Sequence, residues 1–269
     1  MSNALPRFSS RFTFLISALG IAIGTGNIWR FPRIVATNGG ENGAGSFLVA
    51  WIMFLFLWSI PLIIAEYVLG RQSRKGTVGA FAHFMGKPFA FLGGFVGFVS
   101  TAIAFYYSVV VGWNIYYFGS MTFNALPNTT ETSWAIWNNF QNGSFPIFFH
   151  AIAMSVGGFA IYKGVSSIEK VNRILIPTLL VIVLLSVVRA LMLPGSMAGI
   201  TYLFTPDWAQ LKEPRIWLEA LTQNAWDTGA GWGLFLTYAI YVKKRYGVIK
   251  NAFTVAIGNN LVSLMAAIM

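Results

Sequence analysis

Residues 20–32 read GIAIGTGNIWRFP and place glycines at 20, 24 and 26 inside an apolar segment, just before Asn27 and Arg30. Lipid cannot satisfy the backbone groups that a broken helix releases, so irregular backbone at membrane depth is buried in protein or lines a watery cavity. There it can coordinate an ion or a substrate. We therefore expect a helix that unwinds over residues 22–26, with a binding site at the break.

The composition of the 269-residue chain is that of a membrane protein. It is 56% hydrophobic and only 10% charged, and its apolar residues fall in runs of membrane-spanning length. This excludes a soluble globular domain and a disordered chain. The chain has no cysteine, and its two histidines, His83 and His150, are too far apart for a convincing metal cluster.

The net charge of +10 reflects topology rather than a nucleic-acid partner. Positive residues are retained on the cytoplasmic side of a membrane, so we expect a multi-pass protein of the cell membrane with a cytoplasmic amino terminus. Thirteen of the eighteen Lys and Arg lie at alternate ends of the apolar runs: Arg7 and Arg11; Arg71, Arg74, Lys75 and Lys87; Lys163, Lys170 and Arg173; Lys243, Lys244, Arg245 and Lys250.

Seven apolar segments are expected to cross the membrane, at about 11–35, 46–70, 89–118, 145–162, 174–193, 216–242 and 251–269. The polar stretches 119–143 and 194–215 are expected to form external loops. Segments 1 and 6 are both interrupted by glycines and lie five segments apart, so they enter the membrane from opposite sides. Broken helices at corresponding positions of two halves point to a midplane binding site in inverted-repeat transporters.

In segment 1, unwinding would free main-chain carbonyls as ligands for a hard cation, and the next half-helix would begin with amides suited to a carboxylate. The alternative is that the glycines are small-residue packing contacts, since Gly20 and Gly24 form a GxxxG pair. Packing explains neither Asn27 nor the second interrupted helix. The candidate groups are the carbonyls of Gly20, Ala22 and Ile23, the amides of Thr25 and Gly26, and the Asn27 side chain.

Segment 6 supplies the counterpart, with Asp227 in mid-membrane. A carboxylate there is costly and marks an ion or proton path. Trp226 and Trp232 flank the break and could wall an apolar pocket, although lipid or core contact is the equal alternative. Segment 7 places Asn259 and Ser263 four residues apart, hence on one helix face. The polar residues Gln223, Asn224, Asp227 and Thr228 precede Gly229, Gly231 and Gly233.

These motifs resemble the neurotransmitter:sodium symporter family, whose fold is typified by the bacterial leucine transporter. The resemblance implies an all-α membrane protein, an inverted-repeat bundle with helices 1 and 6 unwound in the middle. About seven of the family's roughly twelve crossings would be present: a single transmembrane domain, 1–269, with the first five-helix repeat at 11–193 and an incomplete second repeat from 215 to 269. The matching motifs run from Arg11 to about Ser263: GxGNxWRFP, then NGG at 38–40, PLxxxE…GR at 61–71, the pair Tyr106 and Tyr107, and the break from Gln223 to Gly233.

The resemblance also implies residue roles. One sodium ion would be held by residues matching the Ala22 carbonyl, Asn27, Asp227 and Asn259, and a second partly by the carbonyls of Gly20 and Ile23. The substrate carboxylate would meet the first ion, the amides of Thr25 and Gly26, and the Tyr107 hydroxyl. A glycine at 24 leaves space for that carboxylate, which implies an amino acid substrate. Ile103, Tyr107, Trp226, Gly229 and Trp232 would line the pocket, Arg30 would be the external gate, and Glu66 would support the segment 6 break.

The chain departs from the family pattern in three ways. The largest is length, because the partners expected from segments 8 and 10 are absent: the remaining ligands of the second sodium ion and the acidic partners of both gates. Position 227 is Asp where Thr or Ser is usual, among residues that match the family's chloride site: Trp51, Gln223, Asp227 and Ser263. A fixed carboxylate would repel chloride and could balance the sodium charge, so chloride is not expected as a cofactor. Arg7 stands next to Phe8 rather than in the family's Arg-x-x-Trp arrangement, so the inner gate is expected to differ.

The leading interpretation is the amino-terminal part of a sodium-coupled amino acid symporter that works by alternating access. The alternatives are a truncated membrane protein without transport activity, or a half-transporter that needs a separately encoded second half. Partners to consider are therefore the bilayer, a small amino acid substrate, a second copy of the chain and a missing carboxy-terminal half. An enzyme is not expected, because the sequence offers no Ser-His-Asp, Cys-His or paired-carboxylate set and no third glycine of a dinucleotide fingerprint.

Overall fold

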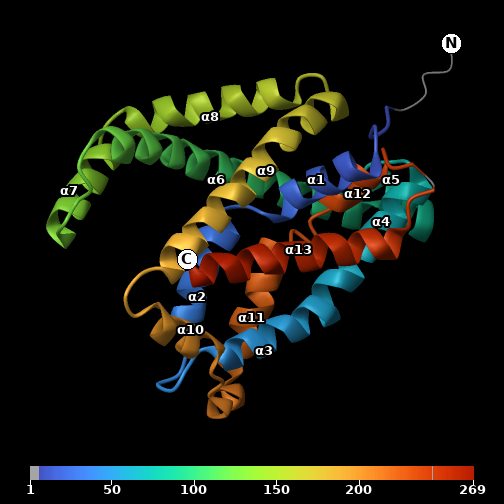
Figure 1. Ribbon diagram of the computed structural model, residues 1–269. Helices are drawn as coiled ribbons and strands as arrows, with labels where there is room; N and C mark the ends of the chain where they lie inside the picture. The colour runs from blue at the N-terminus through green and yellow to red at the C-terminus, as the bar shows by residue number, and fades with distance from the viewer. Residues whose placement is uncertain (1–5, 244) are drawn as a thin grey trace.

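The computed structural model describes residues 6–243 and 245–269, and every regular element within these ranges is a helix. Lys244, which belongs to the last basic cluster of the sequence, lies outside the described residues. The chain forms a packed bundle from which two long helices extend (Figure 1).

The bundle contains both ends of the described chain. Its helices share two buried clusters of apolar side chains. In the first, the Tyr67 ring packs between Phe14 and Phe235, with ring centroids 5.5 and 5.6 Å away. In the second, Phe31 packs on Trp51 at 4.4 Å. The elements are α1 (Arg11–Ala22), a π-helical turn η1 (Gly26–Arg30), α2 (Phe31–Thr37), α3 (Gly45–Phe54), a second π-helical turn η2 (Leu55–Ser59), α4 (Ile60–Ser73), α11 (Pro214–Asp227), α12 (Leu234–Ala239) and α13 (Val248–Ile268).

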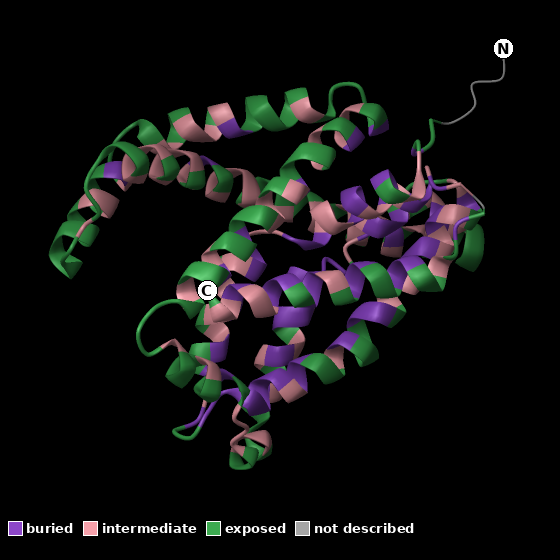
Figure 2. Cartoon of the chain, in the orientation of Figure 1, coloured by how far each residue is buried: buried purple, intermediate pink, exposed green. Residues whose placement is uncertain are grey.

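Three long helices lie outside the bundle. Helices α6 (Ala90–Phe123) and α8 (Phe145–Ile161) lie side by side and extend away from it, and α9 (Val165–Leu191) crosses back to α1 (Figure 1). Gly112 allows the close approach of α6 and α8, because a Cβ there would lie 2.9 Å from the His150 main chain. Figure 2 shows that buried residues gather in the bundle, whereas α6 to α8 carry few of them. Shorter elements are α5 (Thr77–Met85), η3 (Lys87–Phe89), α7 (Thr130–Gln141), α10 (Ser196–Phe204) and η4 (Trp208–Lys212).

By length and composition, four helices of the described chain could each cross a membrane, and the number rises to six if each bent helix pair is one span. The broken segment around residues 228–233 is not among them. The four spans are Gly45–Ser73, Lys87–Phe123, Val165–Leu191 and Val248–Ile268, and the bent pairs are α1 with the helix Gly26–Thr37, and α7 with α8.

Two polar stretches expected as loops contain helices. In 119–143, α7 begins at a capping box in which the side chains and amides of Thr129 and Thr132 bond reciprocally. In 194–215, α10 and η4 pack against the loop before α3, where the Ala44 and Gly45 amides donate to the Tyr202 and Thr205 carbonyls. Helix α9 also begins nine residues before the expected start of segment 5.

Candidate functional site

Helix α1 ends at Ala22, and helical backbone resumes at Gly26 in a direction that differs by 53°. In a continuous helix the Gly24 amide would donate to the Gly20 carbonyl. It donates instead to the Asn27 Oδ1 atom, at 2.8 Å, and the Asn27 amide donates to the Gly24 carbonyl at 3.2 Å rather than to that of Ile23. The carbonyls of Gly20 and Ile23 therefore lose the hydrogen bonds that a regular helix would give them.

A second interruption separates α11 from α12, between Asp227 and Leu234. Gly229, Gly231 and Gly233 have φ angles of 65°, 91° and 74°, a region that residues with a Cβ rarely adopt. The buried Glu66 of α4 accepts the Gly231 amide on Oε1 at 2.6 Å and the Leu236 amide on Oε2 at 3.0 Å. Glu66 thus bridges the break and satisfies amides on both sides of it.

Between the two interruptions, three oxygens come together. The Oδ1 atom of Asn259 lies 3.2 Å from the main-chain oxygen of Ala22 and 3.2 Å from that of Asp227. Turning the Asn259 amide over would let its nitrogen donate to both carbonyls. The Oδ1 atom of Asp227 is buried and has no hydrogen-bond partner among the described residues. The Asn259 amide therefore fits this position in two ways: turned over, as a donor to both carbonyls, or with its oxygen there and a cation between the oxygens.

The side chains around these oxygens form one buried hydrogen-bonded network. Asn27 Nδ2 donates to Asn259 Oδ1 at 2.8 Å and to Ser263 Oγ at 2.7 Å. Ser263 Oγ donates to the second carboxylate oxygen of Asp227, Oδ2, at 3.2 Å. Gln223 Nε2 donates to the same oxygen at 3.3 Å. Donors therefore surround one oxygen of the Asp227 carboxylate and leave the other free.

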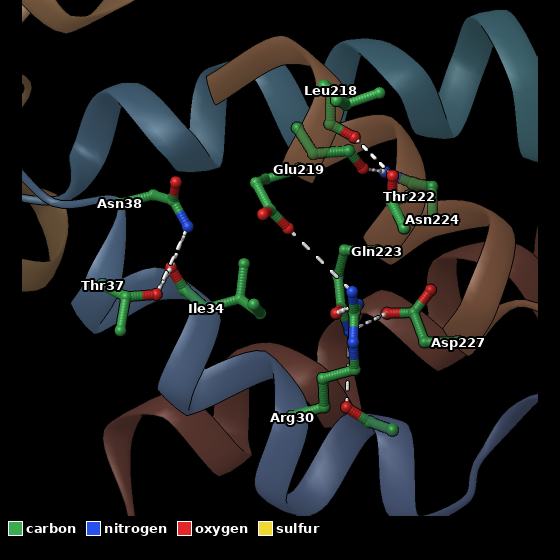
Figure 3. A network of polar contacts seen from close by, with 12 residues as sticks. Arg30, Ile34, Thr37, Asn38, Leu218, Glu219, Thr222, Gln223, Asn224 and Asp227 are labelled. Carbon is green, nitrogen blue, oxygen red and sulfur yellow. Dashed lines mark hydrogen bonds and ion pairs between the residues drawn. The ribbon is translucent and has the colours of Figure 1, made fainter. Parts of the chain in front are cut away.

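At its far end the network reaches Arg30, which donates to Gln223 Oε1 (Figure 3). The Arg30 guanidinium also lies 4.0 Å from the Glu219 carboxylate, and both side chains are less than one-third exposed. Glu219, Gln223 and Asp227 follow one another at intervals of four residues and so share one face of α11. Glu219 was not among the residues expected from the sequence, although this spacing could have indicated it.

A cavity of about 530 Å³ lies beside both breaks. Its lining brings together most residues expected at the substrate and ion sites. Gly229 is not among the described residues that line it: Gly229 is buried and a Cβ at that position would lie 3.3 Å from Ile21 Cγ2. The expected residues in the lining are Gly20, Ala22, Ile23, Gly24, Thr25, Gly26, Ile103, Tyr107, Trp226, Asp227 and Trp232.

Aromatic rings form one wall of the cavity. Trp226 lies 6.2 Å from Tyr107 and 5.7 Å from Trp232, measured between ring centroids. The Thr25 hydroxyl donates to the Tyr107 hydroxyl at 2.9 Å, and a Cβ at Gly24 would lie 3.3 Å from that hydroxyl. The sequence did not indicate Ser100, whose hydroxyl donates to the Trp232 carbonyl and ties α6 to the second break.

Comparison with known proteins agrees with this architecture. The family model described as "Sodium:neurotransmitter symporter family" matches residues 6–144 and 145–269. An uncharacterised sodium-dependent transporter of Methanocaldococcus jannaschii is 32% identical over 96% of this chain and 54% of its own length. The sodium-dependent neutral amino acid transporter B(0)AT3 of Rattus norvegicus is 28% identical over 98% of this chain and 47% of its own length.

The crystal structure of MhsT in complex with L-phenylalanine superposes with a TM-score of 0.85 and 32% sequence identity, covering 99% of this chain and 60% of that one. The fold is thus that of a multi-helix membrane transporter. The chain belongs to the sodium:neurotransmitter symporter family. The relatives that it matches are transporters rather than enzymes. It spans about half the length of the curated relatives it matches.

Proposed function

We propose that this chain carries the ion and substrate sites of a sodium-coupled amino acid symporter of the cell membrane, which works by alternating access. The observation that carries the proposal is the convergence of oxygens where the two interruptions meet. The main-chain oxygens of Ala22 and Asp227, one from each interruption, both lie 3.2 Å from the same end of the Asn259 amide. One oxygen of the buried Asp227 carboxylate has no hydrogen-bond partner among the described residues. A hard cation that prefers oxygen ligands would relieve their mutual repulsion.

The first sodium ion would be held by the carbonyl of Ala22, the side chains of Asn27 and Asn259, and Asp227. Only the Asp227 carboxylate carries a charge in this set, so it would balance the ion. A second sodium ion would use the freed carbonyls of Gly20 and Ile23.

The substrate would bind in the 530 Å³ cavity with its carboxylate toward the Thr25 and Gly26 amides, for which no hydrogen bond is found among the described residues. The Tyr107 hydroxyl lies beside the proposed carboxylate position, since it accepts a hydrogen bond from Thr25. Gly24 has no side chain that would fill this position. The aromatic wall favours an apolar or aromatic side chain. Its rings are those of Tyr107, Trp226 and Trp232, with Ile103 beside them.

Arg30 would act at the external entrance, held by Gln223, and Ser263 would orient Asp227. Glu66 would support the second break. Because Asp227 already places a negative charge beside Gln223 and Ser263, we propose that the transporter does not require chloride.

We also propose about seven membrane crossings, with residues 11–193 as a first five-helix repeat and 215–269 as the start of an inverted second one. Helices 1 and 6 would be those unwound at midplane. The alternating basic clusters favour a cytoplasmic amino terminus. The exposed apolar side chains of α6, such as Phe91, Phe95 and Phe98, suit contact with lipid.

The test is binding of labelled amino acids to the purified, reconstituted protein in sodium chloride and in potassium chloride, followed by uptake into vesicles with an inward sodium gradient. We expect binding only in sodium, and uptake driven by the gradient. Sodium-dependent binding without uptake would favour a half-transporter that needs a second half. Absence of any sodium response would overturn the proposal.

A further inference from the structure

The connection between α8 and α9 lies at the outer edge of the molecule (Figure 1), and Figure 2 shows it as exposed. It carries three exposed cations: Lys163 in the turn, and Lys170 and Arg173 in the first part of α9. Lys170 and Arg173 are three residues apart, so they are neighbours on one side of the helix. None of the three side chains has a hydrogen bond or an ion pair with another described residue.

Two other basic side chains of the alternating clusters show the contrast. Arg74 donates to the Val242 carbonyl at 2.9 Å, and Lys243 donates to the Ser9 carbonyl at 2.8 Å. These side chains join separate parts of the bundle to one another. The cations of the α8–α9 connection have no such structural role.

The chain also offers these cations no free negative charge. Of its eight acidic residues, only Glu169 stands among them in the sequence. Glu169 is buried, and its Oε1 atom accepts the Ser9 amide at 2.7 Å and the Thr13 hydroxyl at 2.6 Å. It stands four residues before Arg173, yet no ion pair joins the two described side chains. The three cations are therefore open to an anion from outside the chain.

Large apolar side chains are exposed beside the cations. Phe159 and Tyr162, at the end of α8, are 83% and 80% exposed, and Ile174 of α9 is 69% exposed. Exposed apolar groups next to cations are typical of the level where hydrocarbon meets lipid headgroups, at which tyrosine is enriched. Lysine and arginine can extend from there to the headgroups. The surface therefore combines a contact for acyl chains with a contact for a negatively charged headgroup.

We propose that the α8–α9 connection binds an anionic phospholipid. Lys163, Lys170 and Arg173 contact the phosphate oxygens of its headgroup, while Phe159 and Tyr162 contact its acyl chains. A zwitterionic headgroup binds less well, because its positive group is repelled by three cations without counter-charges. Anionic lipids give the cytoplasmic leaflet its negative surface potential, and the proposed orientation places this connection on that side. The inference rests on that orientation, and on neither sodium nor amino acid binding.

The experiment measures the unfolding temperature of the full-length purified protein in detergent, at low ionic strength, during titration with phosphatidylglycerol. Parallel titrations use phosphatidylcholine with the same acyl chains, and glycerol phosphate as a free headgroup anion. We expect only phosphatidylglycerol to stabilise the parent strongly. The concentration for half-maximal stabilisation should rise at least tenfold when all three cations are replaced, because each contributes to the attraction. The triple variant is Lys163→Gln, Lys170→Gln and Arg173→Gln.

Two further triple variants serve as controls, and both should match the parent. The first keeps the charge of the connection: Lys163→Arg, Lys170→Arg and Arg173→Lys. The second removes the same amount of charge from exposed residues elsewhere: Arg189→Gln, Lys212→Gln and Arg215→Gln.

An equal response of the parent to phosphatidylcholine would overturn the inference, and so would equal stabilisation by glycerol phosphate, since no lipid would then be needed. A glutamine variant that responds like the parent, or an equal loss in the second control, would place the lipid elsewhere and also overturn it. If the glutamine variant does not fold, the single variants Lys163→Gln and Lys170→Gln decide, and an unchanged response in both contradicts the inference.

The lipid titration is independent of the transport assay. A parent that responds to phosphatidylglycerol but does not bind amino acids in sodium would remove the proposed function and leave the lipid site standing. A parent that binds amino acids in sodium without preferring the anionic lipid would overturn only the lipid site.

Discussion

Asp227 is buried at the point where the Ala22 carbonyl and the Asn259 amide converge, and one of its carboxylate oxygens has no partner among the described residues. Asp227→Asn keeps the shape of the side chain and removes its charge. We expect the sodium concentration for half-maximal amino acid binding to rise at least tenfold, about 1.4 kcal/mol of ion binding. A sodium titration of labelled amino acid binding measures it, with the exposed-loop variant Glu41→Gln as control. Unchanged sodium affinity would show that the carboxylate is not an ion ligand.

The same carboxylate predicts that amino acid binding does not require chloride. Gln223 and Ser263 direct donors toward this position, as an anion site would, but here the Asp227 Oδ2 atom accepts both. A second anion beside it would be repelled at short range. Replacing chloride by gluconate at constant sodium should therefore leave amino acid binding by the parent protein unchanged. A loss of binding in gluconate would contradict the proposal.

The interruption between α11 and α12 depends on Glu66 of α4. Each oxygen of its carboxylate accepts a hydrogen bond from one main-chain amide, and the two amides lie on opposite sides of the interruption. Glu66→Gln turns one acceptor into a donor that faces an amide. An unsatisfied buried group costs about 1–3 kcal/mol, so we expect a lower unfolding temperature and weaker sodium-dependent binding. Thermal unfolding in detergent measures the first effect. The exposed Glu213→Gln should leave both properties unchanged, and an equally stable Glu66→Gln protein would contradict the bridging role.

The packing of α4 on α12 depends on Gly70. A Cβ there would lie 2.0 Å from the Leu236 main-chain oxygen, which belongs to backbone and cannot swing away. Gly70→Ala should therefore destabilise the protein by about 1–3 kcal/mol. The methyl group added by Gly94→Ala on α6 would have no neighbour within 4 Å, and alanine favours helical backbone. This variant should therefore be as stable as the parent or more stable. Parallel unfolding curves compare the two variants; equal stability would contradict the predicted clash.

The sequence predicted both interruptions from glycines that stand beside Asn27 and Asp227, because close helix packing would account for the glycines but not for these polar residues. It could not indicate contacts between residues far apart in the chain, such as Asn172 with Gly20, or Glu169 with Thr13. These depend on how α9 crosses α1, which apolar periodicity does not specify. The helix α7 was overlooked because its residues are polar, and its capping box at Thr129 was the local signal.

At the scale of the whole molecule, the candidate site depends on the bundle rather than on the three long helices outside it. The oxygens that converge come from α1, the end of α11 and α13, and α4 braces the second break through Glu66. Helix α6 contributes one wall of the cavity through Ile103 and Tyr107, while much of its length is exposed (Figure 2). The breaks are therefore held by protein on the bundle side and face the cavity on the other.

The orientation of the whole molecule can be tested directly because the sequence contains no cysteine. Single cysteines at exposed positions then report which side of the membrane each lies on. Since basic clusters are retained in the cytoplasm, Asn142→Cys should react with a membrane-impermeant thiol reagent in intact cells. Ser9→Cys and Lys75→Cys should react only after the cells are permeabilised. The cysteine-free parent is the control for background labelling. The reverse pattern would place the amino terminus outside, and labelling of all three in intact cells would contradict a chain that crosses the membrane between residues 75 and 142.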